Sequence, residues 1–302
     1  VLANRAVADP GNWPDTLHLL PPAPVQDVTP GPADDKYTGG VVGIRAGSAG
    51  YPGAAVLTVS GAVHATPGMV RYAGPEADGV VRVRPEVVAT QRLQDAGRVQ
   101  AWVFGPGAGT GEDAARELAW ALEQEVPLLI DADGLTLLTQ HEHLRRAVAS
   151  RDEPTVVTPH DGEFLRLREA AGVREGTRFE ETLELATTLR ATIVRKGRVT
   201  LVAPEDDPHL VYAVDAGHSW AATPGSGDVL AGIIGAHLAL SAARAAVPGA
   251  VDAAVPGAVT GAVTVHAVAA WLAAQTPFGP ATAPASRIAE HVRDATAEVS
   301  HA

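Results

Sequence analysis

The sequence contains no cysteine, and aromatic residues make up only 4% of its 302 residues. The absence of cysteine excludes disulfide bonds, thiolate metal sites, iron–sulfur clusters and cysteine nucleophiles. Charged residues are also sparse, at 19%, whereas 46% of the chain is hydrophobic, which is typical of a globular protein. Alanine and valine supply most of the apolar bulk, and glycine occurs 31 times. We therefore expect a soluble, cytoplasmic protein rich in small residues.

A basic surface is missing as well. Asp and Glu number 35 against 23 Lys and Arg, which gives a formal net charge of −12 with neutral histidine. Without a basic stripe, this charge argues against binding to nucleic acid or to an anionic membrane surface. Any phosphate-bearing ligand must then be held by local geometry and not by overall attraction.

The first 35 residues have no basic region leading into an apolar run, so we do not expect a signal peptide. They are rich in proline and polar residues, which is typical of an extended linker or arm. We expect residues 1–35 to form such an arm and residues 36–302 to form one domain. Because the sequence begins with valine, we also expect a processed or truncated chain, such as the C-terminal part of a larger protein.

Formal charge is absent from Ala253 to Ser286, a stretch long enough to span a bilayer. The stretch is dominated by Ala, Gly and Thr and contains prolines and a histidine, so we interpret it as a buried helix of a soluble protein. The heptapeptide AAVPGAV occurs twice, at residues 245–251 and 253–259. We expect this duplication to form a loop interrupted by Pro and Gly, before a helix around Val263–Ala274.

Between Tyr37 and Leu240, short β-branched runs alternate with helical stretches. The expected strands are Val41–Arg45, Val99–Phe104, Pro127–Ile130, Thr155–Thr158, Ile193–Arg195, Thr200–Ala203 and Leu210–Val214, the last two as a hairpin, and the expected helices are Gly53–Val63, Glu112–Gln124 and Val229–Ala239. This alternation predicts a mainly parallel sheet with helices on both faces. Ligands of such folds bind beyond the carboxyl ends of the strands, where most turns that contain Gly, Asp or His fall in this chain.

One glycine-rich turn, TPGSGD at Thr223–Asp228, opens a predicted helix. The N–H groups of Gly225, Ser226 and Gly227 are placed to bind a phosphate, where the helix dipole also favours negative charge. Asp228 would then lie close to a transferring phosphoryl group or its acceptor hydroxyl, as a candidate general base. The alternative is that this aspartate only complements the helix dipole.

A second glycine-rich turn, GPGAGTG at Gly105–Gly111, lies between a predicted strand and helix. Glycines there allow backbone N–H groups to approach an anion. Position 112 is Glu where the dinucleotide-binding fingerprint requires Gly or Ala, and no Walker lysine follows. On spacing alone, a tight turn without a ligand explains the segment equally well.

Other polar segments follow predicted strands. In the segment TPHDGE, His160 and Glu163 are candidates for contacting a polar ligand, although a histidine at a strand end is more often an ordinary loop residue. Asp131 and Asp133 could hold a metal indirectly, but we interpret them as caps of the next helix.

Two further segments are rich in basic residues or histidine. Arg195, Lys196 and Arg198 form a basic cluster, which indicates either a polyphosphate contact or a solvated turn. The segment His141–His143 lacks the spacing of a zinc-protease helix, so we expect an exposed charged face there. No serine occupies the nucleophile elbow of an α/β-hydrolase, which weighs against that class.

Taken together, the motifs resemble those of the ADP-dependent NAD(P)H-hydrate dehydratases, a family of the ribokinase-like superfamily. The matching stretches, in chain order, are GIRAGSAGYPGAAVL, GMVRY, VFGPGAGTG, LLIDADGL, TVVTPHDGEFLRL, VRKGRVTLV and AATPGSGDVLAGII, and they span residues 36–275. GSGD is shared with other ribokinase-like kinases, whereas TPHxGE combined with DAD and GPGxG is narrower. The resemblance implies a ribokinase-like three-layer α/β fold, with a mainly parallel central sheet and helices on both faces.

The resemblance also implies a reaction: dehydration of the S-epimer of hydrated NADH or NADPH at the expense of ADP, which releases AMP and phosphate. Asp228 would be the general base, and the turn donors would stabilise the transferred phosphoryl group. The implied substrate contacts are Ala54 or Ala55, Gly107, Gly109, His160 and Asp228. The implied nucleotide contacts are Lys196, Gly197, Arg198, Val199, Thr200, Gly225, Ser226 and Gly227.

By the same resemblance, Mg²⁺ would accompany the nucleotide phosphates, with no direct ligand that we can name, and the chain would form a homotetramer. In many bacteria an NAD(P)H-hydrate epimerase domain precedes this one, so coupling to an epimerase is implied too. Two departures put nucleotide affinity and loop geometry in question: Gly217–Trp220 replaces Gly-Asn-Pro-Gly, and Pro224 replaces a small residue. A vitamin-precursor kinase that uses ATP and a nucleotide-binding sensor without turnover stay open as alternatives.

Overall fold

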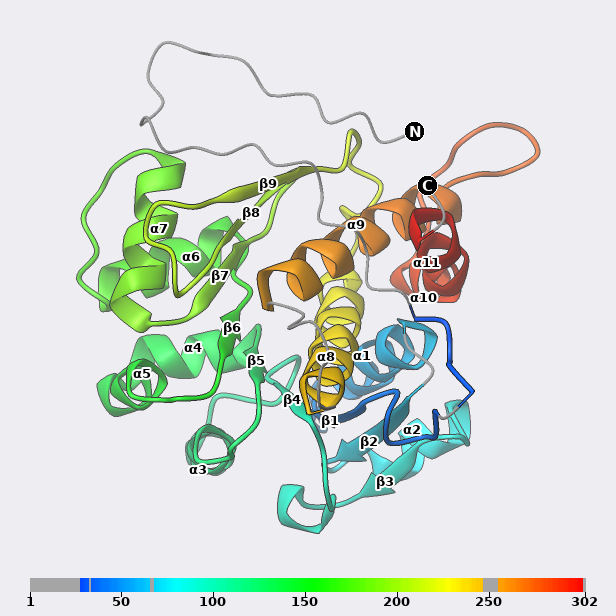
Figure 1. Cartoon of the computed structure of the whole chain (residues 1–302), viewed down its shortest axis with the longest axis horizontal. Helices are drawn as coiled ribbons and strands as arrows, with labels where there is room; N and C mark the ends of the chain where they lie inside the picture. The colour runs from blue at the N-terminus through cyan, green and yellow to red at the C-terminus, as the bar shows by residue number, and fades with distance from the viewer. Residues whose placement is uncertain (1–27, 33, 66–67, 247–254, 301–302) are drawn as a thin grey trace.

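The computed structural model describes residues 28–32, 34–65, 68–246 and 255–300. Most of the predicted arm, and residues 247–254 of the duplicated segment, lie outside these ranges. Within the described residues, the central sheet has nine strands in the order β3-β2-β1-β4-β5-β6-β7-β8-β9 (Figure 1). They are β1 (Val41–Arg45), β2 (Met69–Ala73), β3 (Val88–Thr90), β4 (Ala101–Phe104), β5 (Leu128–Ile130), β6 (Thr155–Val157), β7 (Thr192–Arg195), β8 (Val199–Ala203) and β9 (Tyr212–Asp215).

The sheet is parallel from β3 to β7 and antiparallel across β7, β8 and β9. This arrangement confirms the predicted mainly parallel sheet and the predicted hairpin. Because β8 runs against β7, its first residue lies at the edge where the parallel strands end, and β9 ends at that same edge. The hairpin therefore sends two more chain segments to the ligand-binding edge of the sheet.

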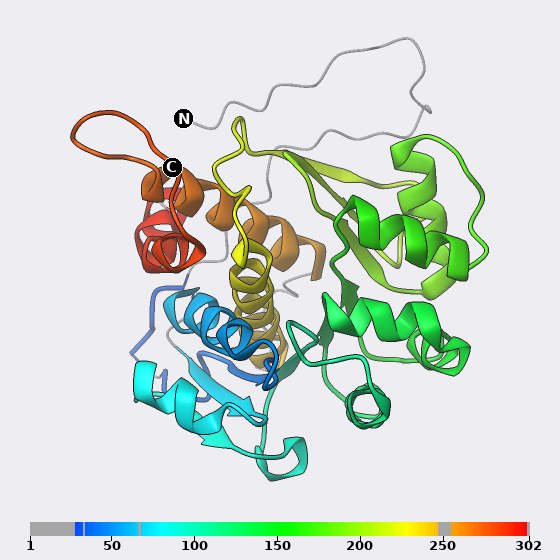
Figure 2. The ribbon, with the colours of Figure 1, turned by 180° about the vertical axis from the view of Figure 1, so that it is seen from behind.

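Helices cover both faces of the sheet, which gives the expected three layers (Figures 1 and 2). They are α1 (Pro52–Ala65), α2 (Ala77–Val83), α3 (Glu112–Leu122), α4 (Asp133–Gln140), α5 (Glu142–Ala149), α6 (Asp161–Ala170), α7 (Arg178–Leu189), α8 (Ser226–Ala245), α9 (Val255–Ala273), α10 (Ala285–Glu290) and α11 (Val292–Ser300). Alternate residues of each strand face opposite layers: Leu129 of β5 packs in the core with α1, α8 and α9, whereas Leu128 and Ile130 pack in the core with α3 to α6.

Two glycines allow α1 and α8 to touch through their backbones. A Cβ on Gly232 would overlap the carbonyl oxygen of Thr58 and lie 2.8 Å from the backbone nitrogen of Ala62. A Cβ on Gly61 would in turn overlap the carbonyl of Val229. Glycine is required at both positions because any side chain would push the helices apart. The contact fixes the N-termini of both helices, which carry predicted site residues.

The predicted elements agree with the structure except near the duplicated segment. The seven predicted strands and the helices α1, α3 and α8 are present, with ends that agree or are shifted by up to six residues. The helix expected at Val263–Ala274 begins at Val255, so the described part of the second AAVPGAV copy is helical and not a loop. Pro256 fits there because the first turn of a helix needs no N–H donor at that position.

Two helices, α8 and α9, are long and apolar enough to cross a membrane by length and composition alone. In α8, 83% of the apolar window is buried inside the protein, and in α9 the share is 72%. Core helices of a folded domain pass the same test, and both helices pack against the strands in one core. The burial agrees with our interpretation of the uncharged stretch as a buried helix.

Candidate active site

The carboxyl ends of β1, β4, β5, β6 and β7 lead directly into the segments singled out from the sequence. Gly47, Gly105–Gly111, Asp131–Asp133, Thr158–Glu163 and Lys196 follow these strands in that order. Parallel strands end at the same edge of a sheet, so the fold gathers these segments, and α8 begins beside them. The predicted location of the ligand site at this edge therefore has a structural basis.

Gly225 precedes α8 in a left-handed conformation, with φ of 84°. A Cβ at this position would lie 2.5 Å from Leu57 Cδ1, so both the φ and the available space require glycine. The N–H groups of Gly227 and Asp228 lie in the first turn of the helix, where no intrahelical acceptor is available. The N–H of Ser226 instead donates to the carbonyl of Thr223 at 3.2 Å, so it closes the turn and is not free for a phosphate as predicted.

A buried histidine that we did not single out from the sequence fixes this turn. His266 of α9 places its Nε2 2.9 Å from the Oγ of Ser226 and 3.1 Å from the carbonyl oxygen of the same residue. Burial lowers the pKa of His266 to about 4, so the ring is neutral at physiological pH. The backbone oxygen can only accept, and Nε2 therefore carries the proton. The contact spans 40 residues of sequence, and nothing in the local pattern of α9 indicates it.

Asp228 lies in a cluster of acidic side chains with one ammonium group. Burial is the main cause that raises the pKa of its carboxyl to about 7, and the negative charges of Asp131, Asp133 and Glu163 raise it further. Lys196 opposes this effect. A carboxyl with this pKa ionises near neutral pH and is then a stronger base than an ordinary aspartate. Its burial among other acids favours the chemical interpretation of Asp228 over a role limited to the helix dipole.

Asp131 and Asp133 do not cap α4, which corrects our interpretation. The residue before that helix, Ala132, has a positive φ of 49°, and no side chain caps the helix. Asp131 is buried and accepts a hydrogen bond from the Nζ of Lys196 at 2.7 Å. Asp133 accepts a 2.8 Å bond from the backbone N–H of Gly109 and so orders the second glycine-rich loop. Both carboxylates therefore support the site.

The three residues of the predicted basic cluster, Arg195, Lys196 and Arg198, do not share one role. Arg195 is buried, forms ion pairs with Asp161 at 2.7 Å and Glu181 at 2.9 Å, and stacks on the ring of Phe164. It belongs to the core beneath α6 and α7, so a polyphosphate contact is wrong for this residue. Lys196 and Arg198 do line the cavity described below.

His160 combines both roles considered from the sequence. Its Nδ1 accepts hydrogen bonds from the N–H groups of Gly162 and Glu163, and the Glu163 carboxylate accepts from the N–H of His160. This capping box fixes the imidazole at the start of α6. The side chain is still 58% exposed and lines the cavity, while its Nε2 lies 3.5 Å from the Oε1 of Glu163.

A cavity of about 540 Å³ lies beside the turn that precedes α8. One wall is apolar and comes from β9, the loop after it, α8 and α9, and the polar wall comes from the loop after β7 and from the glycine turn. Of the predicted nucleotide contacts, Lys196, Gly197, Arg198, Thr200, Ser226 and Gly227 line the cavity, whereas Val199 and Gly225 do not. His218 and Pro224, which lie where this sequence differs from the family pattern, both line the cavity. An apolar slot beside phosphate donors suits a nucleotide base and its phosphates.

Two of the predicted substrate residues, Gly107 and Ala54, meet at the start of α1, whereas His160 lines the cavity described above. A Cβ on Gly107 would lie 2.8 Å from the Cβ atoms of both Ala54 and Tyr51, so the second glycine-rich loop packs against the start of α1. Ala54 is partly exposed there, whereas Ala55 is fully buried and unavailable to a ligand. The structure thereby favours Ala54 of the two alternatives.

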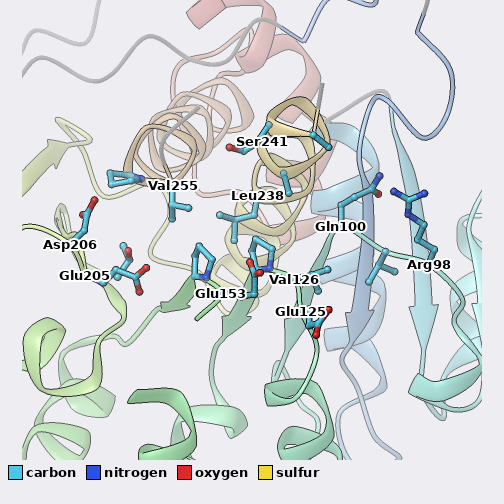
Figure 3. Close-up of a pocket in the computed structure, with 18 residues that line it drawn as sticks. Arg98, Gln100, Glu125, Val126, Glu153, Glu205, Asp206, Leu238, Ser241 and Val255 are labelled. Carbon is cyan, nitrogen blue, oxygen red and sulfur yellow. The ribbon is translucent and has the colours of Figure 1, made fainter. Parts of the chain in front are cut away.

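A second cavity, of about 610 Å³, lies at the opposite edge of the sheet (Figure 3). Gln100, Val126 and Glu153, which line it, each precede a parallel strand, and Glu205 and Asp206 come from the β8–β9 turn. None of the predicted site residues lines this cavity. It lies at the amino ends of the parallel strands, away from the edge where such folds bind their ligands.

The described parts of the chain hold no group of three or more His, Cys, Asp or Glu residues placed to bind a metal ion. Asp131, the most buried carboxylate of the site, is already paired with Lys196. The residues therefore do not form a metal cage of their own, and a Mg²⁺ ion would have to arrive with nucleotide phosphates.

The fold and the site define a class: an α/β protein with a mainly parallel sheet, a glycine turn at the N-terminus of α8 and a nucleotide-sized cavity beside that turn. Comparison with known proteins is more specific. The sequence profile of the NAD(P)H-hydrate dehydratases matches residues 42–292. An ADP-dependent (S)-NAD(P)H-hydrate dehydratase of Neisseria meningitidis serogroup B is 35% identical over 68% of this chain and 72% of the relative. The chain therefore belongs to the NAD(P)H-hydrate dehydratase family.

Two further similarities concern length and fold. A bifunctional NAD(P)H-hydrate repair enzyme of Corynebacterium glutamicum is 49% identical over 91% of this chain and 50% of the relative, so the chain spans about half the length of such relatives. The crystal structure of a ribokinase-like superfamily protein from Enterococcus faecalis covers 96% of this chain with a TM-score of 0.76, at 20% identity. This structural match confirms the predicted ribokinase-like fold.

Proposed function

We propose that this chain dehydrates the S-epimer of hydrated NADH and NADPH at the expense of ADP, which restores NAD(P)H and releases AMP and phosphate. The observation that supports this function best is the position of Asp228. It lies in the first turn of α8, directly after Gly227, which lines the nucleotide-sized cavity, and burial raises its pKa to about 7. A base in this place can act on a hydroxyl that receives a phosphoryl group.

The reaction follows from these positions. Asp228 takes the proton of the C6 hydroxyl as that oxygen attacks the β-phosphoryl group of ADP, and AMP leaves. The N–H donors at the start of α8 stabilise the charge on the transferred group. The lone pair of the ring nitrogen then forms a double bond to C6 as the C6–O bond breaks and phosphate departs. Loss of a proton from C5 gives the C5–C6 double bond of the dihydronicotinamide.

Several further properties belong to the same proposal. Mg²⁺ would enter with the nucleotide, the chain would act in the cytoplasm as a homotetramer, and it would work beside an NAD(P)H-hydrate epimerase. The bifunctional name of the Corynebacterium relative supports the last of these properties.

The direct test is to incubate the protein with hydrated NADH and to follow NADH absorbance with ADP, with ATP and without nucleotide. We expect recovery that requires nucleotide and that is lost in Asp228→Asn, which keeps the shape of the side chain but removes its basicity. A wild-type protein that binds nucleotide without any recovery would instead support the sensor. A protein that consumes ATP only with a hydroxylated vitamin precursor would support the kinase.

A further inference from the structure

The chain has only two lysines, and one of them lies inside the site. Lys196 follows β7, and its backbone N–H donates to the carbonyl of Pro159 at 2.8 Å. Its side chain is 17% exposed, and Nζ lies 2.7 Å from the Oδ1 of Asp131 and 3.8 Å from the Oε2 of Glu163. The side chain is therefore held from two sides within the acidic cluster.

The same ammonium lies against the phosphate-binding turn. A Cβ added to Gly227 would lie 3.6 Å from Nζ, and Lys196 is the nearest group to that position. Gly227 therefore places no side chain between the ammonium and the first turn of α8, which carries the free N–H donors, and both residues line the cavity. An anion seated on these donors would lie within reach of Nζ.

The charges around Nζ are unbalanced. Asp131 faces it from the β5–α4 turn, Glu163 from α6 and Asp228 from α8, whereas α9 and the α6 cap contribute the neutral His266 and the exposed His160. Burial alone would lower the pKa of Lys196, but Asp131 and Glu163 outweigh burial and raise it, so the side chain stays charged. A buried charge is tolerated only when it is paired, and Asp131 provides the shortest pairing.

We propose that Asp131 is a positioning residue that holds the Lys196 ammonium beneath Gly227, where the ammonium binds the phosphoryl group that ADP transfers. The proposal rests on the proposed function and assigns Lys196 to the transferred group and not to the AMP part of the nucleotide. Asp131 touches neither ligand. It acts by orienting the ammonium and by its charge near Asp228.

The first test compares ADP with AMP by calorimetry in one magnesium-containing buffer. Lys196→Met should weaken ADP binding by roughly 10- to 100-fold, the loss of one charge-assisted contact, and leave AMP binding within about twofold. Lys36→Met is the matched control, because the other lysine of the chain lies outside the site, over the ring of Tyr37. Equal losses for ADP and AMP, or no loss for either, would overturn the proposal.

A second variant separates the role of the ammonium from folding. Lys196→Met leaves Asp131 buried without its partner, so it should also lower the melting temperature. The double variant Asp131→Asn/Lys196→Met removes both charges and should recover stability but not ADP affinity. Recovery of ADP affinity along with stability would show that the ammonium does not bind the phosphoryl group.

The third test uses the pH dependence of kcat/KM. Removing the negative charge in Asp131→Asn should move the acidic limb to lower pH, because that charge raises the pKa of Asp228. Removing the positive charge in Lys196→Met should move the limb to higher pH, each by about one pH unit. If Asp131 and Lys196 only stabilise the fold, the two substitutions should not move the acidic limb in opposite directions. If the wild-type protein restores no NADH, the proposed function fails, while the ADP–AMP comparison still tests Lys196 by itself.

Discussion

At the scale of single residues, the site depends on one carboxyl group whose ionisation is costly. Asp228 lies among other acids, and burial is the first reason that its pKa reaches about 7. The same burial that makes it a useful base near neutral pH disfavours its charged form in the folded protein. Activity and stability therefore oppose each other at this residue.

This opposition predicts how Asp228→Asn changes stability with pH. The folded pKa is about 7 against 3.8 for an ordinary aspartate, so wild-type stability is complete below about pH 4 and falls as pH rises to 7. Asn does not ionise, and the variant should therefore be more stable than wild type at pH 8, by on the order of 2 kcal/mol.

Thermal melts at pH 4, 6 and 8 would measure this difference, which should shrink toward zero at pH 4. Asp113→Asn, which removes an exposed carboxylate outside the acidic cluster, is the control for the loss of one charge. A variant that is less stable than wild type at pH 8 would contradict the explanation.

At the scale of elements, the position of the site depends on the crossing of α1 and α8. Ala54 lies near the start of α1 and Asp228 near the start of α8, and the two helices meet at Gly61 and Gly232. The substrate side and the catalytic turn are therefore held relative to each other by backbone contact. No side chain at this crossing can adjust to absorb added volume.

We predict that Gly232→Ala destabilises the protein by roughly 2 kcal/mol or more, because its Cβ would overlap the Thr58 carbonyl. The variant that still folds should also have a lower kcat, because the N-terminal ends of α1 and α8 would move apart. Urea denaturation and steady-state kinetics would measure both effects. Gly79→Ala in α2 is the matched control: its Cβ would have no contact closer than 3.7 Å, so it should be neutral or slightly stabilising.

The elements also show what could be predicted from the sequence and what could not. β1 and β4 to β9 contain runs of β-branched or apolar residues between turn signals, and the glycine turns stand out without any structure. β2 carries Arg71 and Tyr72, and β3 is a three-residue edge strand, so neither gave a clear signal. The pairs Lys196–Asp131 and Ser226–His266 join residues 65 and 40 positions apart, and such contacts arise only when the chain folds.

At the scale of the whole molecule, every predicted site residue lies on the described part of the chain. Chemically hydrated NADH contains both epimers at C6, and one asymmetric site should accept only one of them. The other epimer should then react only after it has epimerised at C6. The chain spans about half the length of its bifunctional relatives.

We therefore predict that NADH absorbance recovers in two phases when the protein acts on the mixed epimers with excess ADP. A fast phase should end at the fraction of S-epimer, and a slow phase should follow spontaneous epimerisation. Adding an NAD(P)H-hydrate epimerase should merge the two phases, and heat-inactivated epimerase is the control. Complete recovery in a single fast phase without epimerase would contradict the assignment to one epimer.

The reversal of strand direction after β7 has a consequence for how relatives of this protein can differ. It returns Gly197–Arg198 and Ala216–His218 to the nucleotide cavity and leaves residues 204–211 as a turn at the far edge of the sheet. Length changes in that turn do not touch the cavity, whereas length changes at either returning segment alter its wall directly. The hairpin thus separates positions at which an insertion leaves the cavity wall intact from positions at which an insertion alters it.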